Sequence, residues 1–267
     1  MIYINALQQT DLDVVSTFQP SGWPDIMPSI RFYLETPFCF PLKVTYNNLI
    51  AGIGTGIEHN GSGWLAHIIV HPDYRNKGIG TIITKTLMDN FKAKGISSLY
   101  LLASDLGERV YEKLGFVTQS QYLLFKDITP FSNASPPPNI IPASANHIAQ
   151  IAELDKQASG EDRMLHLQLF LKGGYVYLSD NIVNGFYLPG WGEGLIIANN
   201  SSAGIALMQL RLATKNYAAF PSENKDAIAF MHQIGSSPFQ SVKRMCFGPS
   251  MPWQPQYLYN RIRGNLG

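Results

Sequence analysis

The N-terminal half of this 267-residue chain is organised around the stretch Val70-His71-Pro72-Asp73-Tyr74-Arg75-Asn76-Lys77-Gly78-Ile79-Gly80-Thr81. It joins an apolar run, residues 64–70, to a segment with apolar residues at helical spacing, residues 79–94. Glycines at 78 and 80 let a ligand approach the backbone closely. The first N–H groups of a helix lack intrahelical partners and form the positive end of the helix dipole. The stretch therefore predicts a phosphate site, with Arg75 and Lys77 adding positive charge at its mouth.

Patterns on both sides of this stretch predict alternating strands and helices. Before it we expect a strand at 2–6, helices at 10–18 and from Pro24, and strands at 38–46, 49–58 and 64–70. After it we expect a helix ended by Gly95, a strand at 98–103, a helix at 106–114 and a strand at 116–125. The helix after the stretch has one apolar stripe, made of Ile79, Ile82, Ile83, Leu87 and Phe91.

A proline-rich segment divides the chain into two halves of similar size. Residues 132–139 read Ser-Asn-Ala-Ser-Pro-Pro-Pro-Asn, and three successive prolines suit neither a helix nor a central strand. They favour an extended spacer. We therefore predict domains at residues 1–131 and 140–267, joined by a linker at 132–139.

Several motifs in the first half are similar to those of one enzyme family. Arg75, Gly78 and Gly80 fill the pattern (Q/R)-x-x-G-x-(G/A), and Val70 and Pro72 match the residues that precede it. The segment Tyr111-Glu112-Lys113-Leu114-Gly115-Phe116 adds a second match. Over residues 2–125 the chain resembles the GNAT superfamily of N-acetyltransferases. The resemblance implies an α/β (α+β) fold with two GNAT-like domains. Each would have a mixed, mostly antiparallel sheet, splayed at the cofactor site and flanked by helices.

The resemblance also implies a cofactor, acetyl-CoA, which serves as co-substrate without a metal ion. In the family, the strand before the loop splays from its neighbour and pairs with the pantetheine amides. By position, the backbone groups of Ile68, Ile69 and Val70 would take this part. The diphosphate would be held by the N–H groups of the loop, namely those of Asn76, Lys77, Gly78, Ile79, Gly80 and Thr81.

Candidate catalytic residues follow from the same resemblance. Tyr111 occupies the position of the family's general acid, which protonates the leaving thiolate. A general base for the amine has two candidates, Glu58 at the end of its strand and His67 within the strand 64–70. Trp64 falls near the family's acidic base position, so direct deprotonation by a side chain stays open. The alternatives are structural: Tyr111 and His67 as core residues, and Glu58 as a solvated turn residue.

The second half resembles a degenerate GNAT module placed behind the first, as in tandem acetyltransferases. The residues that carry this resemblance are Asp155, Gly160-Glu161-Asp162-Arg163, Pro221, Asn224, Gly235 and Arg244-Met245. Its counterpart of the phosphate loop, residues 197–204, has no Arg-x-x-Gly-x-Gly pattern and no flanking basic residue. We therefore expect it not to bind acetyl-CoA in the usual way. It would close over the acceptor pocket of the first domain or complete a hydrophobic interface.

Composition limits the partners of the chain. The net charge is +1 with no basic run, which argues against nucleic-acid binding. No apolar run reaches the ~20 residues of a membrane-spanning helix, and the first residues lack a secretion signal, so we expect a cytoplasmic protein. Cys39 and Cys246 have no metal-ligand spacing and are expected to be ordinary thiols.

The sequence thus predicts an N-acetyltransferase that moves acetyl from acetyl-CoA to a primary amine, most simply that of a small molecule. It would act as a monomer or homodimer. Two alternatives remain at this point. One is a non-catalytic module that binds acyl-CoA, and the other is an N-acetyltransferase that acts on proteins.

Overall fold

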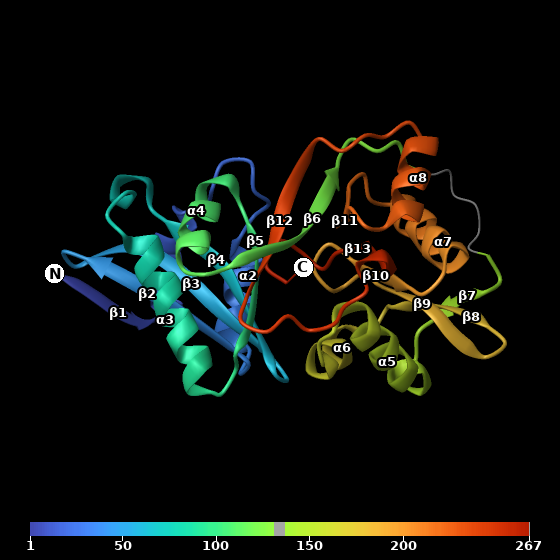
Figure 1. Cartoon of the computed structure of the whole chain (residues 1–267), viewed down its shortest axis with the longest axis horizontal. Coiled ribbons are helices and arrows are strands. Elements are labelled where there is room, and N and C mark those ends of the chain that lie inside the picture. Colours follow the sequence, from blue (N-terminus) through green and yellow to red (C-terminus); the bar gives the residue numbers. More distant parts are fainter. Residues whose placement is uncertain (131–136, 267) are drawn as a thin grey trace. The chain divides into compact units, whose positions relative to one another are not determined.

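A computed structural model describes residues 1–130 and 137–266, which fall into two compact units. Unit 1 contains Met1–Val117 together with Met245–Pro249, and unit 2 contains Thr118–Arg244 and the residues from Ser250 on (Figure 1). The units divide at Val117, whereas the sequence places the boundary at residue 131. Most of the predicted linker at 132–139 lies outside the described residues, so the predicted domains stay a prediction.

Unit 1 follows the predicted alternation of elements. In chain order they are β1 (Ile2–Ala6), η1 (Gln9–Asp11), α1 (Leu12–Ser16), α2 (Met27–Glu35), β2 (Cys39–Tyr46), β3 (Leu49–His59), β4 (Ser62–Val70), η2 (Pro72–Tyr74), α3 (Ile79–Ala93), β5 (Ser98–Ala103) and α4 (Asp105–Lys113). The strand order is β1-β2-β3-β4-β5. All neighbours are antiparallel except β4 and β5, which are parallel. The predicted mixed, mostly antiparallel sheet is confirmed.

The end of β12 (Gln240–Phe247) completes unit 1 beside β5. Phe247 packs against Phe116 with ring centroids 5.6 Å apart. The Ser98 hydroxyl donates to the Pro249 carbonyl over 2.7 Å. A side chain at Gly248 would collide with the Ser97 carbonyl, because an added Cβ would lie 2.0 Å from that oxygen. Five residues from the far end of the chain are thus built into this unit.

Helix α3 packs closely on the sheet because glycines replace side chains beneath it. A Cβ added at Gly54 would lie 2.4 Å from Cγ2 of Ile83. The helix buries Ile79, Ile83, Leu87 and Phe91, as the predicted stripe requires. This contact fixes the first turn of α3 relative to the strands, with the Cβ position of Gly80 3.7 Å from Val70 at the end of β4.

Strand β4 separates from β5 after three residues. The parallel pairs are Ser62 with Ser98, Gly63 with Leu99 and Trp64 with Tyr100, and none follows within the described strands. On its other edge β4 carries a bulge, because residues 67 and 68 together stand between the pairs Ala66–Thr55 and Ile69–Ile53. His67 there has φ of 45°, a left-handed conformation that non-glycine residues rarely adopt. The edge of β4 that faces β5 is therefore open from Leu65 to Val70.

Unit 2 repeats the order of elements found in unit 1. It contains β6 (Val117–Phe125) from Thr118 on, β7 (Ile140–Pro142), η3 (Ala145–His147), α5 (Ile148–Ser159), α6 (Met164–Phe170), β8 (Tyr175–Ser179), β9 (Ile182–Leu188), β10 (Leu195–Ala198), α7 (Ser201–Leu212), β11 (Ala218–Pro221), α8 (Lys225–Gln233), most of β12, η4 (Pro255–Tyr257) and β13 (Leu258–Asn260). Two strand orders occur here, β13-β10-β9-β8-β7 and β12-β6-β11. The succession of elements from β1 to β5 in unit 1 thus recurs from β7 to β11 in unit 2.

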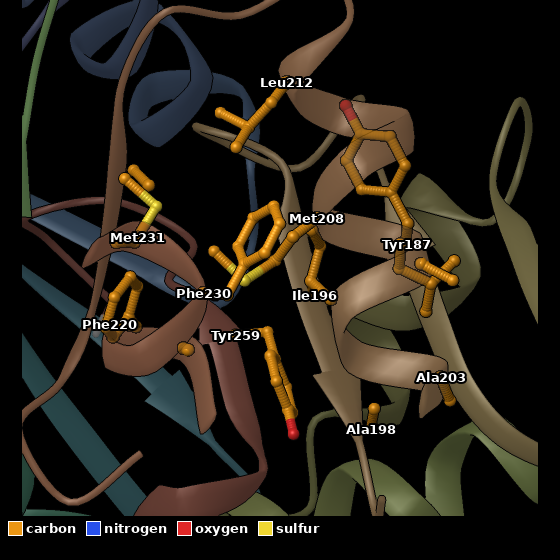
Figure 2. Close-up of a cluster of buried hydrophobic side chains, with 14 of the residues drawn as sticks. Tyr187, Ile196, Ala198, Ala203, Met208, Leu212, Phe220, Phe230, Met231 and Tyr259 are labelled. Carbon is orange, nitrogen blue, oxygen red and sulfur yellow. The ribbon is translucent and has the colours of Figure 1, made fainter. Parts of the chain in front are cut away.

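The core of unit 2 gathers around α7 and α8. Figure 2 shows side chains from both helices, with Met208 and Phe230 next to one another, above the ring of Tyr259 from β13. Phe220 of β11 stacks on Phe125 of β6 at 5.1 Å. Burial of these apolar side chains is the main favourable contribution to the stability of this unit.

The close approach of α3 generates a stability prediction. We expect Gly54→Ala to lower the free energy of unfolding by about 1–3 kcal/mol, because the added methyl group would overlap Ile83. Denaturant titration followed by circular dichroism would measure the change. Gly190→Ala is the matched control, since a Cβ there has no neighbour within 4 Å. Equal stabilities of the two variants would contradict the packing.

Candidate functional site

The first turn of α3 presents a row of unpaired backbone N–H groups. The first residue to donate within the helix is Ile82, whose N–H lies 3.0 Å from the Gly78 carbonyl. No N–H of residues 76–81 has an acceptor in the described part of the chain, and no side chain caps the helix. These six donors stand at the positive end of the helix dipole, which favours an anion.

The backbone conformation of this loop depends on glycine. Gly78 has φ of 76° and Asn76 has φ of 60°, so the chain makes a left-handed turn directly before α3. A Cβ at Gly78 would meet no atom within 4 Å, so the loop is not packed against other residues at this position. A row of unpaired N–H donors at a helix N-terminus fits an anion such as a phosphate group.

The basic residues of the loop take different places. The Lys77 ammonium lies 5.2 Å from the ring centroids of both Tyr46 and Tyr74, in a double cation–π contact. Its charge is held beside the loop by these two rings. Arg75 is exposed at the start of the loop.

The predicted pantetheine edge lies directly before the loop. Ile69 and Val70 of β4 pair with Ile53 and Gly52 of β3 on one side, and the other side of the strand has separated from β5. Ile68 packs its side chain toward α3, 3.4 Å from the Cβ position of Gly54. The open edge can pair with an extended, amide-bearing chain as an added strand would.

Tyr111 is buried on α4 with its hydroxyl free of protein partners in the described residues. Its ring packs edge-on against Phe116 and covers Gly107 one turn earlier, where a Cβ would lie 2.8 Å from the ring. The residue is 8% exposed, and no hydrogen bond from the described residues reaches its hydroxyl group. Burial raises the pKa of the Tyr111 hydroxyl well above its ordinary value, so the group keeps its proton.

His67 lies at the bulge of β4, within reach of α2. Its Nδ1 is 2.7 Å from the hydroxyl of Tyr33, which is 1% exposed. Trp23 approaches the imidazole edge-on at 6.2 Å, and its side chain is 43% exposed. The imidazole is thus oriented by a buried tyrosine while its surroundings stay partly open.

Glu58 is placed differently from His67. Its carboxylate pairs with the Lys94 ammonium at the end of α3. Glu58 lies opposite Gly63, at the end of β4 where β4 and β5 are still paired. The structure therefore separates Glu58 from the loop by most of the length of β4.

Two positioning residues, Tyr33 and Gly107, were missed by sequence reasoning. Tyr33 lies in the helix expected from Pro24, but it is 34 residues away from His67, and no local pattern indicates their contact. The spacing of Gly107 and Tyr111, four residues apart on a helix, is a signal that could have been found. Among the described residues no group of three or more His, Cys, Asp or Glu side chains could hold a metal ion. No described helix is long and apolar enough to cross a membrane.

A family model matches the part of the chain that contains these residues. Residues 11–116 match the model described as the acetyltransferase (GNAT) family. These residues form a GNAT acetyltransferase domain. The match begins just before α1 and ends just before β6, and therefore includes the open edge of β4, the loop before α3 and Tyr111.

Known proteins extend the comparison beyond this GNAT domain. The cysteine-rich protein 2-binding protein of Mus musculus is 29% identical over 115 residues, which are 42% of this chain and 14% of that protein. A putative acetyltransferase from Pyrococcus horikoshii has a similar fold, with a TM-score of 0.84, 20% identity and coverage of 100% of this chain and 96% of the other. A tandem GNAT protein from the clavulanic acid biosynthesis pathway has a TM-score of 0.63 at 14% identity, covering 94% of this chain and all of the other. The fold of the whole chain is therefore that of a tandem GNAT protein.

The raised pKa of Tyr111 predicts a pH effect on stability. The unfolded chain loses this proton near the ordinary tyrosine pKa of about 10, whereas the folded GNAT domain keeps it. The contribution of the protonated Tyr111 to the free energy of unfolding is therefore fully present below pH 10 and is lost as the pH rises. Above pH 10 we expect wild type to lose up to about 1.4 kcal/mol per pH unit more than Tyr111→Phe.

Denaturant titrations between pH 9 and 11.5 would measure this difference. Tyr3→Phe is the control, because it removes the hydroxyl of a tyrosine that is 49% exposed on β1. Parallel curves for wild type and Tyr111→Phe would show that the hydroxyl ionises without cost in the folded state.

Proposed function

We propose that the GNAT domain transfers acetyl from acetyl-CoA to a primary amine of a small molecule. The observation that carries this proposal is the row of six unpaired N–H groups at residues 76–81, next to the open edge of β4. Such donors gain most from a ligand with two phosphate charges. The proposed compartment is the cytoplasm, where acetyl-CoA is present.

The proposed binding mode uses the site from end to end. The N–H groups from Asn76 to Thr81 hold the diphosphate, and Arg75 and Lys77 add positive charge. The backbone of Ile68, Ile69 and Val70 pairs with the pantetheine amides as an added strand. Bound in this way, acetyl-CoA supplies an acetyl thioester, which an amine attacks with release of the thiol. The protein holds the two reactants in one orientation, which lowers the entropic part of the barrier.

Two side chains of the GNAT domain move protons in this scheme. Tyr111 holds a proton on its hydroxyl oxygen and passes it to the departing sulfur. His67 accepts the proton that the amine gives up. The 2.7 Å contact between its Nδ1 and the Tyr33 hydroxyl orients the imidazole for this role. Glu58, the other candidate base, is already paired with Lys94.

The proposed acceptor is the primary amine of a small molecule. The similar tandem protein comes from a biosynthetic pathway for clavulanic acid, which supports a small-molecule acceptor here. A non-catalytic acyl-CoA module and a protein N-acetyltransferase are the other outcomes that the assays below distinguish.

Cofactor binding is tested by a charge placed in the first turn of α3. Gly80→Glu should leave the fold intact, because its Cβ position is 3.7 Å from Val70 and a carboxylate suits a helix N-terminus. The same carboxylate would repel a diphosphate, so we expect coenzyme A affinity to fall at least about tenfold in titration calorimetry. The matched control is Ser202→Glu, at the second residue of α7 in unit 2, which should bind as wild type does. If Ser202→Glu lost coenzyme A affinity and Gly80→Glu kept it, the binding site would lie in unit 2.

Catalysis is tested by thiol release from acetyl-CoA with a panel of amines. We expect Tyr111→Phe to lower kcat by about 10²-fold or more while coenzyme A affinity stays unchanged. His67→Gln should lower kcat in the same way. Tyr46→Phe is the control, since it keeps the aromatic ring beside Lys77 and loses only a hydroxyl.

The same assay separates the competing functions. Tight binding of coenzyme A without thiol release for any amine would favour the non-catalytic module. Labelled polypeptides in a lysate supplied with radioactive acetyl-CoA would favour a protein N-acetyltransferase.

A further inference from the structure

The two units differ at the strand that precedes the helix α3 in unit 1 and α7 in unit 2. In unit 1 the succession β4, α3, β5 leaves an open gap where β4 and β5 part. In unit 2 the corresponding succession is β10, α7, β11. Here β10 pairs in an antiparallel manner with β13, the last strand of the chain, through Ile196 with Asn260 and Ile197 with Leu258. A strand thus lies where unit 1 keeps a gap.

The other edge of this strand is also bonded. The Arg261 N–H donates to the Ala219 carbonyl over 2.7 Å, and the Ala219 N–H donates to the Asn260 side-chain oxygen over 3.0 Å. The Asn224 side chain, which caps α8, donates to the Leu258 carbonyl over 2.8 Å. Leu258–Arg261 therefore bridges β10 on one side with β11 and α8 on the other, as an inserted strand does.

The side chain of Tyr259 in β13 packs against the first turn of α7. A Cβ added at Gly204 would lie 2.1 Å from Cζ of Tyr259, so the ring rests on the helix backbone at this glycine. Figure 2 shows its hydroxyl pointing toward the part of the core that holds Ala198 and Ala203. Ser201 and Asp226 lie beside this hydroxyl, and burial together with the Asp226 carboxylate raises the pKa of Tyr259. A phosphate in this place would meet a carboxylate.

The start of α7 also differs from that of α3 in its N–H groups. The Asn200 side chain accepts from the Ala203 N–H over 2.9 Å, whereas no side chain caps α3 within the described residues. The helix is thus capped by its own chain, as asparagine commonly does. An anion gains less there than at the uncapped start of α3.

Polar groups fix the strand in its register. Arg261 makes two hydrogen bonds with the Glu193 carboxylate, at 2.9 and 3.0 Å, and both side chains are buried. The Asn260 amide donates to the Gly194 carbonyl over 2.8 Å. Breaking these contacts would leave buried charges and amides without partners, which is costly.

We propose that the gap between β10 and β11 is a binding site for an extended polypeptide strand, that its ligand is the chain's own segment Leu258–Arg261, and that this segment keeps coenzyme A out of unit 2. An extended peptide and the pantetheine arm both present amides along a line, so one can take the place of the other. The proposal does not depend on the activity of unit 1.

The first test measures whether the strand is held against α7. Hydrogen exchange of the full chain would compare wild type, Gly204→Ala and Gly190→Ala. We expect the amides of residues 258–262 to exchange about 10- to 100-fold faster in Gly204→Ala, because the methyl group displaces Tyr259, and to be unchanged in Gly190→Ala. If Gly204→Ala does not fold, the near-isosteric Asn260→Asp replaces it, with faster exchange of the same amides expected. Unchanged protection in a folded variant would overturn the proposal.

The second test asks where coenzyme A binds. Exchange of wild type would be followed with and without millimolar coenzyme A. The amides of residues 199–204 at the start of α7 should be unaffected. Protection of these amides would overturn the proposal, because coenzyme A would then bind beside the gap between β10 and β11 while Leu258–Arg261 is present. Protection at residues 76–81 concerns the function proposed for unit 1 alone, and its absence would contradict that function while leaving the role of Leu258–Arg261 intact.

Discussion

The separation of β4 from β5 is the constraint on which the rest of unit 1 depends. Two parallel strands normally satisfy each other's backbone groups along their length, and here they do so for only three residues. A bulge at His67, with a left-handed backbone, accompanies the separation and re-aims the strand. The conformation costs energy for a residue with a side chain, and such cost is commonly retained at functional sites.

Helix α3 exploits the opening that this separation creates. The helix packs against glycines of β3. Its first turn therefore lies within contact distance of Val70, where the open edge of β4 ends. Backbone groups of two kinds, from a strand edge and from a helix start, are thereby next to one another. Because these donors are main-chain groups, the site is specified by conformation more than by side-chain identity.

Much of this could be predicted from the sequence where the signal is local. The strand at 64–70 and the helix at 79–94 correspond to β4 and α3 with shifts of one or two residues, because alternation, glycine and helical spacing act within the segment itself. The strands expected at 38–46 and 49–58 are joined by Asn47 and Asn48, which both have positive φ. The helix expected from Pro24 begins at Met27, since a proline start signal fixes the boundary only to within a few residues.

What could not be predicted depends on residues far apart in the chain. The contact of Tyr33 with His67 joins a helix to a strand bulge, and no periodic pattern in the sequence predicts it. Strand β13 has only three residues and reads as an aromatic tail, yet it is held by partners near residues 196, 219 and 224. Short strands of this kind are defined by the groove they enter, so their own sequence carries little signal.

The contribution of Met245–Pro249 to unit 1 has a consequence for biosynthesis. During translation the acetyltransferase unit lacks its final strand until residue 249 has left the ribosome, although every other element of that unit is made by residue 117. The edge of β5 stays unpaired through the synthesis of more than a hundred residues, a period in which exposed strand edges favour misassembly. The fold thereby couples completion of the first unit to synthesis of the second, and a nascent chain that stalls early leaves an incomplete enzyme.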